Sequence, residues 1–345
     1  MSYPKPLSEK SLQRKYAEAG ISEEKAGFLR DFFTACTNLY GALYAIEAWD
    51  IYKVLSRIAQ TPSLHRKDMF AALGILRRES LPYYVFEVDE VYSAEERAER
   101  FRVIASKDLI GRGYGKFFLY YKLMEDLGDQ PFFIPENLPA YKDGMFDEPA
   151  QELISFLEGK KCTMRSYTDY EGKEVLYRYT GKRLKDFSFI GRDDQFDLDY
   201  LRGKLGHRKP DLKQAEELER DLHKYNAAQR LVYDLQRESR LGFFGPADSM
   251  QLFFKHTEEM GLVFSEKEMK QVIAMISDLH NHTHQWCIRG WMPSELSRAM
   301  PRKGMPALSF GPGMQKAFAD GSIDREELVR ELAKKGITVV EDENG

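Results

Sequence analysis

Three consecutive helical patterns near the start of the chain constrain its fold more than any other feature. The segments EEKAGFLRDFFTACTNLY and AIEAWDIYKVLSRI carry apolar residues at helical spacing, and Gly41 lies between them. A third segment, LHRKDMFAALGILRRES, places Met69, Phe70, Leu73 and Leu76 on one face. Each segment therefore predicts a helix, and the third predicts a helix with one side packed into a core.

Two runs typical of strands follow these helices. PYYVFEVDEVY is rich in β-branched and aromatic residues, and FRVIASKDLI reads as a second strand or a short helix. Three helices followed by a hairpin are the outline of a winged helix. We therefore expect a mainly α chain (α+β), with a winged-helix-like domain at residues 1–112.

The remainder of the chain divides into three segments by composition. Residues 113–160 read as a connecting helical segment. Residues 161–245 read as a basic, aromatic β-hairpin followed by one long charged helix, DLKQAEELERDLHKYNAAQRLVYDLQRESR. Residues 246–345 read as a C-terminal helical domain and tail, and a small β-hairpin is expected in the middle of the chain.

Charge and apolar content limit the classes of protein that fit. The net charge of -4 provides no overall attraction to nucleic acid or to a membrane surface. The N-terminus lacks the apolar core of a signal peptide, and no window approaches the roughly 18 apolar residues of a membrane span. These features predict a soluble, cytoplasmic protein that binds no membrane.

Three cysteines lie far apart in the chain, at Cys36, Cys162 and Cys287. An odd number at such spacing does not indicate a disulfide framework. We therefore expect reduced thiols that are mostly buried.

The third predicted helix raises a nucleic-acid hypothesis. Its face opposite Leu73 carries Lys67, Ala71, Gly74 and Arg78, so two cations bracket small residues that a phosphate backbone could approach. Acidic and basic residues are balanced over residues 1–110, whereas nucleic-acid-binding modules are usually basic. The alternative is a small helical domain that contacts protein.

A second basic region, between residues 160 and 209, interleaves cations with tyrosine and phenylalanine. Arg178, Lys182 and Arg183 lie close to these aromatics and could bind single-stranded nucleic acid. The favoured alternative is the solvated face of a hairpin whose aromatic side chains pack inward.

A capping box gives the clearest helix start in the chain. Ser265 is followed three positions later by Glu268, and the apolar pattern then continues toward Gly290. These signals predict a helix from about Glu266 to Arg289.

This predicted helix carries an unusual group of chemically active residues. His280, His284 and Cys287 line one edge of its buried stripe, while His282 faces water. A histidine pair four residues apart can bind Zn²⁺, but His280 and Cys287 lie about 10 Å apart along a helix axis, too far for one ion. The favoured alternative is a pair of core-margin histidines beside a buried cysteine, and no catalytic residue is predicted.

One motif, N-x-T-x-x-W-x-x-x-G-x-x-P-x-E-L, runs from Asn281 to Leu296. It resembles a signature of an uncharacterised bacterial protein family whose members often carry a C-terminal SEC-C zinc motif. The usual asparagine and arginine of that signature are His282 and His284 here. No cysteine follows Cys287, so the SEC-C motif is missing and the family's zinc binding does not carry over.

Three functional hypotheses follow, and the first is favoured. The chain is expected to be a non-enzymatic interaction or adaptor protein with an unknown protein partner and no cofactor. The second hypothesis is a regulatory protein that binds nucleic acid through its first domain. The third is a metalloprotein, or a hydrolase, centred on His280 and His284.

Overall fold

The computed structural model describes residues 3–92, 98–111, 115–143, 147–206, 209–243 and 245–299. Over these residues the chain is mainly helical with two small antiparallel sheets, which confirms the predicted mainly α (α+β) class. The finer prediction, a winged-helix-like domain, stays a prediction. The C-terminal part of the fourth predicted segment, residues 300–345, lies outside the described residues.

The first part of the chain alternates helices with the strands of one sheet. The elements are α1 (Glu9–Glu18), α2 (Glu23–Tyr40), β1 (Ala42–Tyr44), α3 (Ala45–Ile58), α4 (Arg66–Leu76), β2 (Tyr83–Phe86) and β3 (Val103–Ser106). The strand order is β1-β3-β2, and both pairings are antiparallel. The connection between β2 and β3 includes α5 (Val88–Val91) and the 3-10 helix η1 (Glu99–Phe101).

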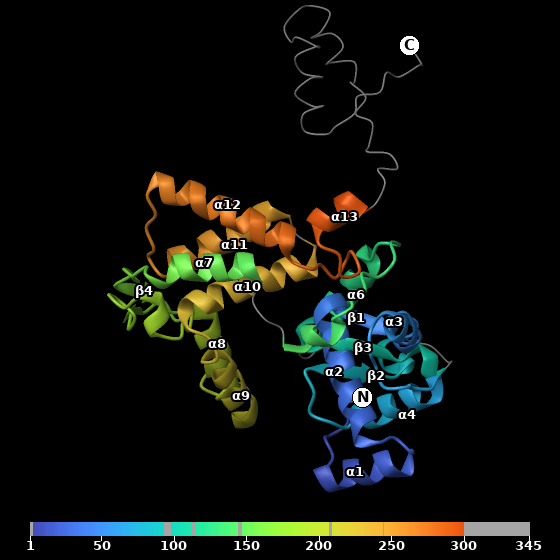
Figure 1. Ribbon diagram of the computed structural model, residues 1–345. Coiled ribbons are helices and arrows are strands. Elements are labelled where there is room, and N and C mark those ends of the chain that lie inside the picture. Colours follow the sequence, from blue (N-terminus) through green and yellow to red (C-terminus); the bar gives the residue numbers. More distant parts are fainter. Residues whose placement is uncertain are drawn as a thin grey trace, which may run out of the picture. The chain divides into compact units, whose positions relative to one another are not determined.

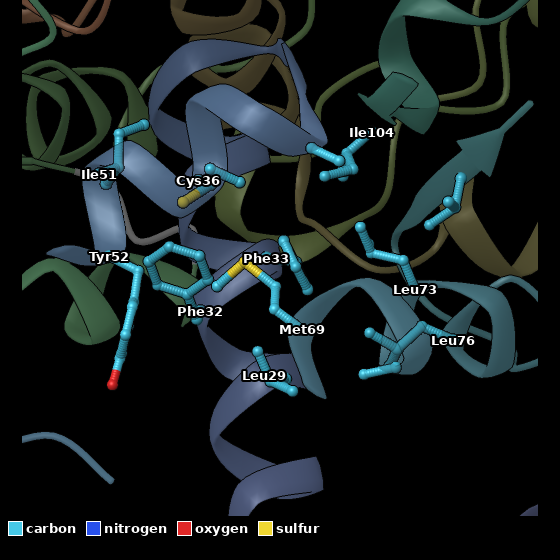
Figure 2. Packing of buried hydrophobic residues seen from close by; sticks show 14 of the residues in the cluster. Leu29, Phe32, Phe33, Cys36, Ile51, Tyr52, Met69, Leu73, Leu76 and Ile104 are labelled. Atoms are coloured by element: carbon cyan, nitrogen blue, oxygen red, sulfur yellow. The ribbon is translucent and has the colours of Figure 1, made fainter. Parts of the chain in front are cut away.

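A core of apolar side chains surrounds α2. Leu29, Phe32 and Phe33 on α2 are fully buried, and Met69 and Leu73 of α4 pack in the same cluster (Figure 2). This arrangement confirms the one-face pattern expected for α4, whereas α2 lies inside the core and has no exposed residue from Lys25 to Tyr40. Strand β2 is shorter than the expected PYYVFEVDEVY, because the backbone turns into α5 after Glu87.

Shorter elements follow the sheet and lead to the second half of the chain. They are η2 (Lys107–Leu109), α6 (Phe118–Asp126), η3 (Leu138–Asp143) and α7 (Glu148–Glu158). The segment η3 packs along α2. Its neighbour α7 begins at Asp147, whose carboxylate accepts a hydrogen bond from the Ala150 backbone N–H.

The second half contains a small hairpin and a group of helices. Its elements are β4 (Ser166–Thr168), β5 (Glu174–Leu176), η4 (Leu184–Asp186), α8 (Arg192–Leu201), α9 (Leu212–Leu222), α10 (Ala227–Leu241), α11 (Pro246–Glu259) and α12 (Glu266–His282). Helices α7, α10, α11 and α12 lie side by side and enclose a second core (Figure 1). None of the helices in the described ranges has the length and apolar character needed to cross a membrane.

The single charged helix predicted over residues 211–240 is wrong, because the chain forms two helices there. Helix α9 ends at Leu222, and Asn226 starts α10 with a reciprocal capping box involving Gln229. These cap hydrogen bonds satisfy backbone groups that a continuous helix would have paired internally.

Residues Met1–Pro293 form one compact unit and Ser294–Gly345 form a second. Helix α13 (Pro293–Ala299) contains the described residues of the second unit. The four-segment division predicted from composition stays a prediction.

Candidate functional site

The predicted helix that carries the histidine motif ends earlier than expected. The capping box of Ser265 and Glu268 is confirmed, but α12 stops at His282 rather than near Arg289. The Gln285 N–H donates to Trp291 O at 3.0 Å, and the Trp286 N–H donates to Arg240 O at 2.7 Å. These bonds replace helical ones, so residues 283–292 form a turn.

Trp286 anchors this turn to the first part of the chain. Its side chain is buried, and its indole Nε1–H donates to Asn38 O at 2.9 Å. The ring lies against Gly41, where an added Cβ would lie 2.5 Å from the indole. Gly290 approaches Tyr40 in the same way, since a Cβ at this position would lie 2.7 Å from the phenol ring. Two glycines therefore permit close contact between the turn and the end of α2.

Two further side chains tie the turn to the extended segment at residues 128–133. The Arg289 Nε–H donates to Gly128 O, and the Trp291 Nε1–H donates to Pro131 O, both at 2.8 Å. In return the Phe133 N–H donates to Arg289 O at 3.1 Å. The turn thus joins three stretches that are far apart in the sequence.

The three predicted metal-ligand residues have different partners. His280 Nε2 lies 3.2 Å from Gln285 Nε2, His284 Nδ1 lies 2.6 Å from Gly290 O, and the Cys287 thiol donates to Gly242 O at 3.3 Å. Among the described residues, no group of three histidine, cysteine or acidic side chains is arranged to hold a metal ion. Zinc binding here stays a prediction.

Burial accounts for the acid-base properties of this group. It lowers the pKa of His280, whose Nδ1 has no hydrogen-bond partner within the described ranges, and it raises the pKa of Cys287 to about 11. All three cysteines are free and buried, as predicted. The thiol of Cys287 is therefore protonated at neutral pH and a poor nucleophile.

His284 lies in the wall of a cavity of about 290 Å³. The cavity walls come from α2, η3, the start of α7, α10 and the turn at residues 283–292; they comprise Asn38, Leu39, Asn137, Ala140, Tyr141, Asp147, Gln236, Arg240, Thr283, His284 and Met292. We call this the Asp147–Arg240 cavity, because these two residues bring opposite charges to it.

The Asp147–Arg240 cavity contains functional candidates that the sequence patterns did not reveal. The Asp147 carboxylate accepts from the Gln236 Nε2–H at 2.9 Å. Burial raises the pKa of this carboxyl, while its hydrogen bonds and the nearby charges of Arg240 and His284 oppose the shift. The cap position of Asp147 before Pro149 was readable from the sequence, but its approach to α10 depends on packing.

The cations predicted for nucleic-acid binding on α4 differ in accessibility. Lys67 is exposed together with Ala71 and Gly74, as expected, whereas Arg78 lies after the end of α4 and is half-buried. Two arginines that the sequence patterns did not single out lie nearby. Arg77 donates to Glu90 at 2.7 Å, and Arg102 donates to Glu87 at 3.0 Å.

The second predicted group of cations lies beyond β5. Arg178 and Lys182 pack over the ring of Tyr179, which is itself buried and stacked on Phe187. Arg183 pairs with Asp186. Tyr179 and Phe187 therefore face a core, in line with the favoured alternative of inward-packed aromatics.

Comparison of the chain with protein-family models, curated proteins and solved structures gives no match. The resemblance to the SEC-C-associated family and the cytoplasmic location stay predictions.

Proposed function

We propose that the chain is a non-enzymatic interaction protein whose residues 1–112 form a winged-helix-like module that binds another protein. The order of elements supports the fold assignment. Helices α1 and α2 precede β1, α3 and α4 follow it, and β2 and β3 complete a sheet in which β3 is central. A fold of this kind serves several functions, so the charges and the apolar side chains on its surface indicate the class of partner.

The charges of the module argue for a protein partner rather than nucleic acid. Arg77 and Arg102, beside the candidate recognition helix α4, are paired with Glu90 and Glu87. An arginine already bound by carboxylates offers little net positive charge to a phosphate.

The observation that carries the proposal is an apolar pair on the outer side of α3. Val54 and Ile58 are one helical turn apart, so they share a face, and they are 40% and 45% exposed. Exposed apolar side chains that adjoin one another favour burial against a partner. We therefore expect a partner that contributes apolar side chains to this face.

The test is affinity purification of the full chain from its native cells after mild cross-linking. Val54→Asp with Ile58→Asp is expected to abolish cross-links to partner protein that map to α3. Both positions are exposed, so the double variant should retain its melting temperature. Val263→Asp changes an 80% exposed valine far along the chain and is the matched control.

Retention of the same α3 cross-links in the double variant would contradict the proposal. Catalytic turnover that a single substitution abolishes would contradict the non-enzymatic part of it.

Nucleic-acid binding is the second candidate, and one feature of α4 favours it. Arg66 and Lys67 are exposed in its first turn, and neither has an ion pair within the described ranges. The first turn of a recognition helix is where contacts to a groove are made in helix-turn-helix proteins.

Fluorescence anisotropy with labelled double-stranded DNA and single-stranded RNA tests this second candidate. Binding should fall steeply with salt and should weaken in Lys67→Ala and Arg66→Ala, with a salt slope reduced by about 0.9 per lost phosphate contact. Lys213→Ala on exposed α9 is the control. Absence of binding to both probes at low salt would exclude this function.

A further inference from the structure

One arginine of the Asp147–Arg240 cavity has no hydrogen-bond or ion-pair partner among the described residues. Arg240 lies in the last turn of α10 and is half-buried. Its guanidinium makes no hydrogen bond or ion pair with any residue in the described part of the chain, whereas Arg77, Arg102 and Arg289 all bind protein oxygen atoms. Five N–H donors are therefore available to an acceptor in the cavity.

The same cavity presents a carboxylate with remaining capacity to accept hydrogen bonds. One oxygen of Asp147 accepts from the Ala150 N–H at 3.1 Å, and the other accepts from Gln236 at 2.9 Å. Each carboxylate oxygen has two lone pairs, so each can accept a second donor. Arg240 affects the pKa of Asp147 through its charge but makes no direct ion pair with it. The carboxylate and the guanidinium therefore both line the cavity without pairing with each other.

The remaining wall fixes the shape of the cavity and supplies apolar surface. The Nδ2 group of Asn38 donates to Tyr141 O at 2.8 Å, and His284 Nδ1 lies 2.6 Å from Gly290 O. Leu39 and Met292 add apolar side chains. Because the polar groups are held by backbone carbonyls, the cavity is largely formed before any ligand enters.

We propose that the Asp147–Arg240 cavity binds a small zwitterion of the α-amino-acid class. The carboxylate of the ligand pairs with Arg240, its ammonium group donates to Asp147, and its side chain contacts Leu39 and Met292. Arginine and carboxylate form strong, charge-assisted hydrogen bonds.

Charge and size favour this ligand class over the alternatives. A phosphate dianion would be repelled by Asp147, and a simple amine would leave Arg240 unpaired. A volume of about 290 Å³ is near the lower end of small-molecule sites, which span about 300–1,000 Å³. The cavity is a different surface from the α3 face, so ligand binding here is independent of the proposed protein partner.

The test is isothermal titration calorimetry of the full chain with each of the standard L-amino acids as a probe. For the tightest binder, two matched probes follow: its deaminated acid and its decarboxylated amine. Saturable binding of at least one amino acid is expected. Both matched probes should bind with an affinity at least about tenfold lower, because each of them lacks one charged contact.

Two substitutions locate the site without disturbing the fold. Arg240→Gln is expected to weaken amino-acid binding at least about tenfold, because the charged partner of the carboxylate is lost. Asp147→Asn keeps a good helix cap. It is expected to weaken binding of the amino acid but not binding of its deaminated analogue. Arg220→Gln removes an exposed cation from the last turn of α9 and is the matched control.

Three results would overturn the proposal. They are no binding by any amino acid, unchanged affinity in Arg240→Gln, or equal affinity of the wild type for the amino acid and its deaminated acid. Unchanged melting temperatures in both variants show that any loss of binding is local to the cavity.

Discussion

His280 and His284 are one helical turn apart in the sequence pattern, yet their side chains meet different surroundings. His280 lies on α12 and is buried, and its Nδ1 has no hydrogen-bond partner in the part of the chain that the structure describes. His284 lies after the helix, near Tyr141 Oη at 3.2 Å, in the wall of the Asp147–Arg240 cavity. The helix ends before Thr283, so the backbone changes direction between the two histidines. The imidazole of His280 therefore stays on α12, while that of His284 lies in the cavity wall.

The burial of His280 predicts a pH-dependent stability. Because the folded pKa is below the ordinary value of 6.5, the unfolded chain takes up the proton more readily, and the free energy of unfolding falls as pH drops below 6.5. His280→Gln is therefore expected to lose less stability than the wild type between about pH 7.5 and about pH 5.5, measured by urea unfolding. His223→Gln, at an exposed position, is the control and should follow the wild type. Equal losses in wild type and His280→Gln would contradict this account.

At the scale of elements, local signals located particular helix starts and ends. The start of α12 at Ser265 and the end of α2 at Gly41 were both readable, because caps depend on residues within one turn. The break between α9 and α10 and the early end of α12 were missed. In the second case the Trp286 N–H bonds to Arg240 O, a partner that no local pattern identifies.

At the scale of the whole unit Met1–Pro293, the turn at residues 283–292 contacts segments that are far apart in the sequence. Trp286 and Cys287 belong to a buried cluster that also contains Ala42, Phe86 and Leu241. Because Trp286 packs against the end of α2, we expect a substitution at Gly41 to lower the stability of the entire unit.

Gly41→Ala is expected to destabilise the unit strongly. The backbone at Gly41 has φ 74°, and a Cβ there would lie 2.5 Å from the Trp286 ring. Gly20→Ala is a matched control, because Gly20 has φ 67° but nothing within 4 Å of an added Cβ. Both variants place an L side chain at positive φ, which costs about 1–2 kcal/mol in the left-handed helical region. Gly41 has ψ -58° and lies outside that region, so backbone strain adds to its loss. Gly41→Ala should lose about 1–3 kcal/mol more through overpacking, measured by chemical denaturation. Equal losses in the two variants would contradict the role of this contact.

The sequence alone determined the helical class, the one-face packing of α4, and the cap of α12. These features depend on periodicity and on neighbours within a turn, so they are encoded locally. Tertiary structure decided that His284, Arg240 and Asp147 line one cavity. They come from separate helices and a turn, and they converge only because Trp286 packs against Gly41 and fixes the turn beside α2 and α10. Convergence of this kind depends on contacts between residues up to 248 positions apart, which no local pattern contains.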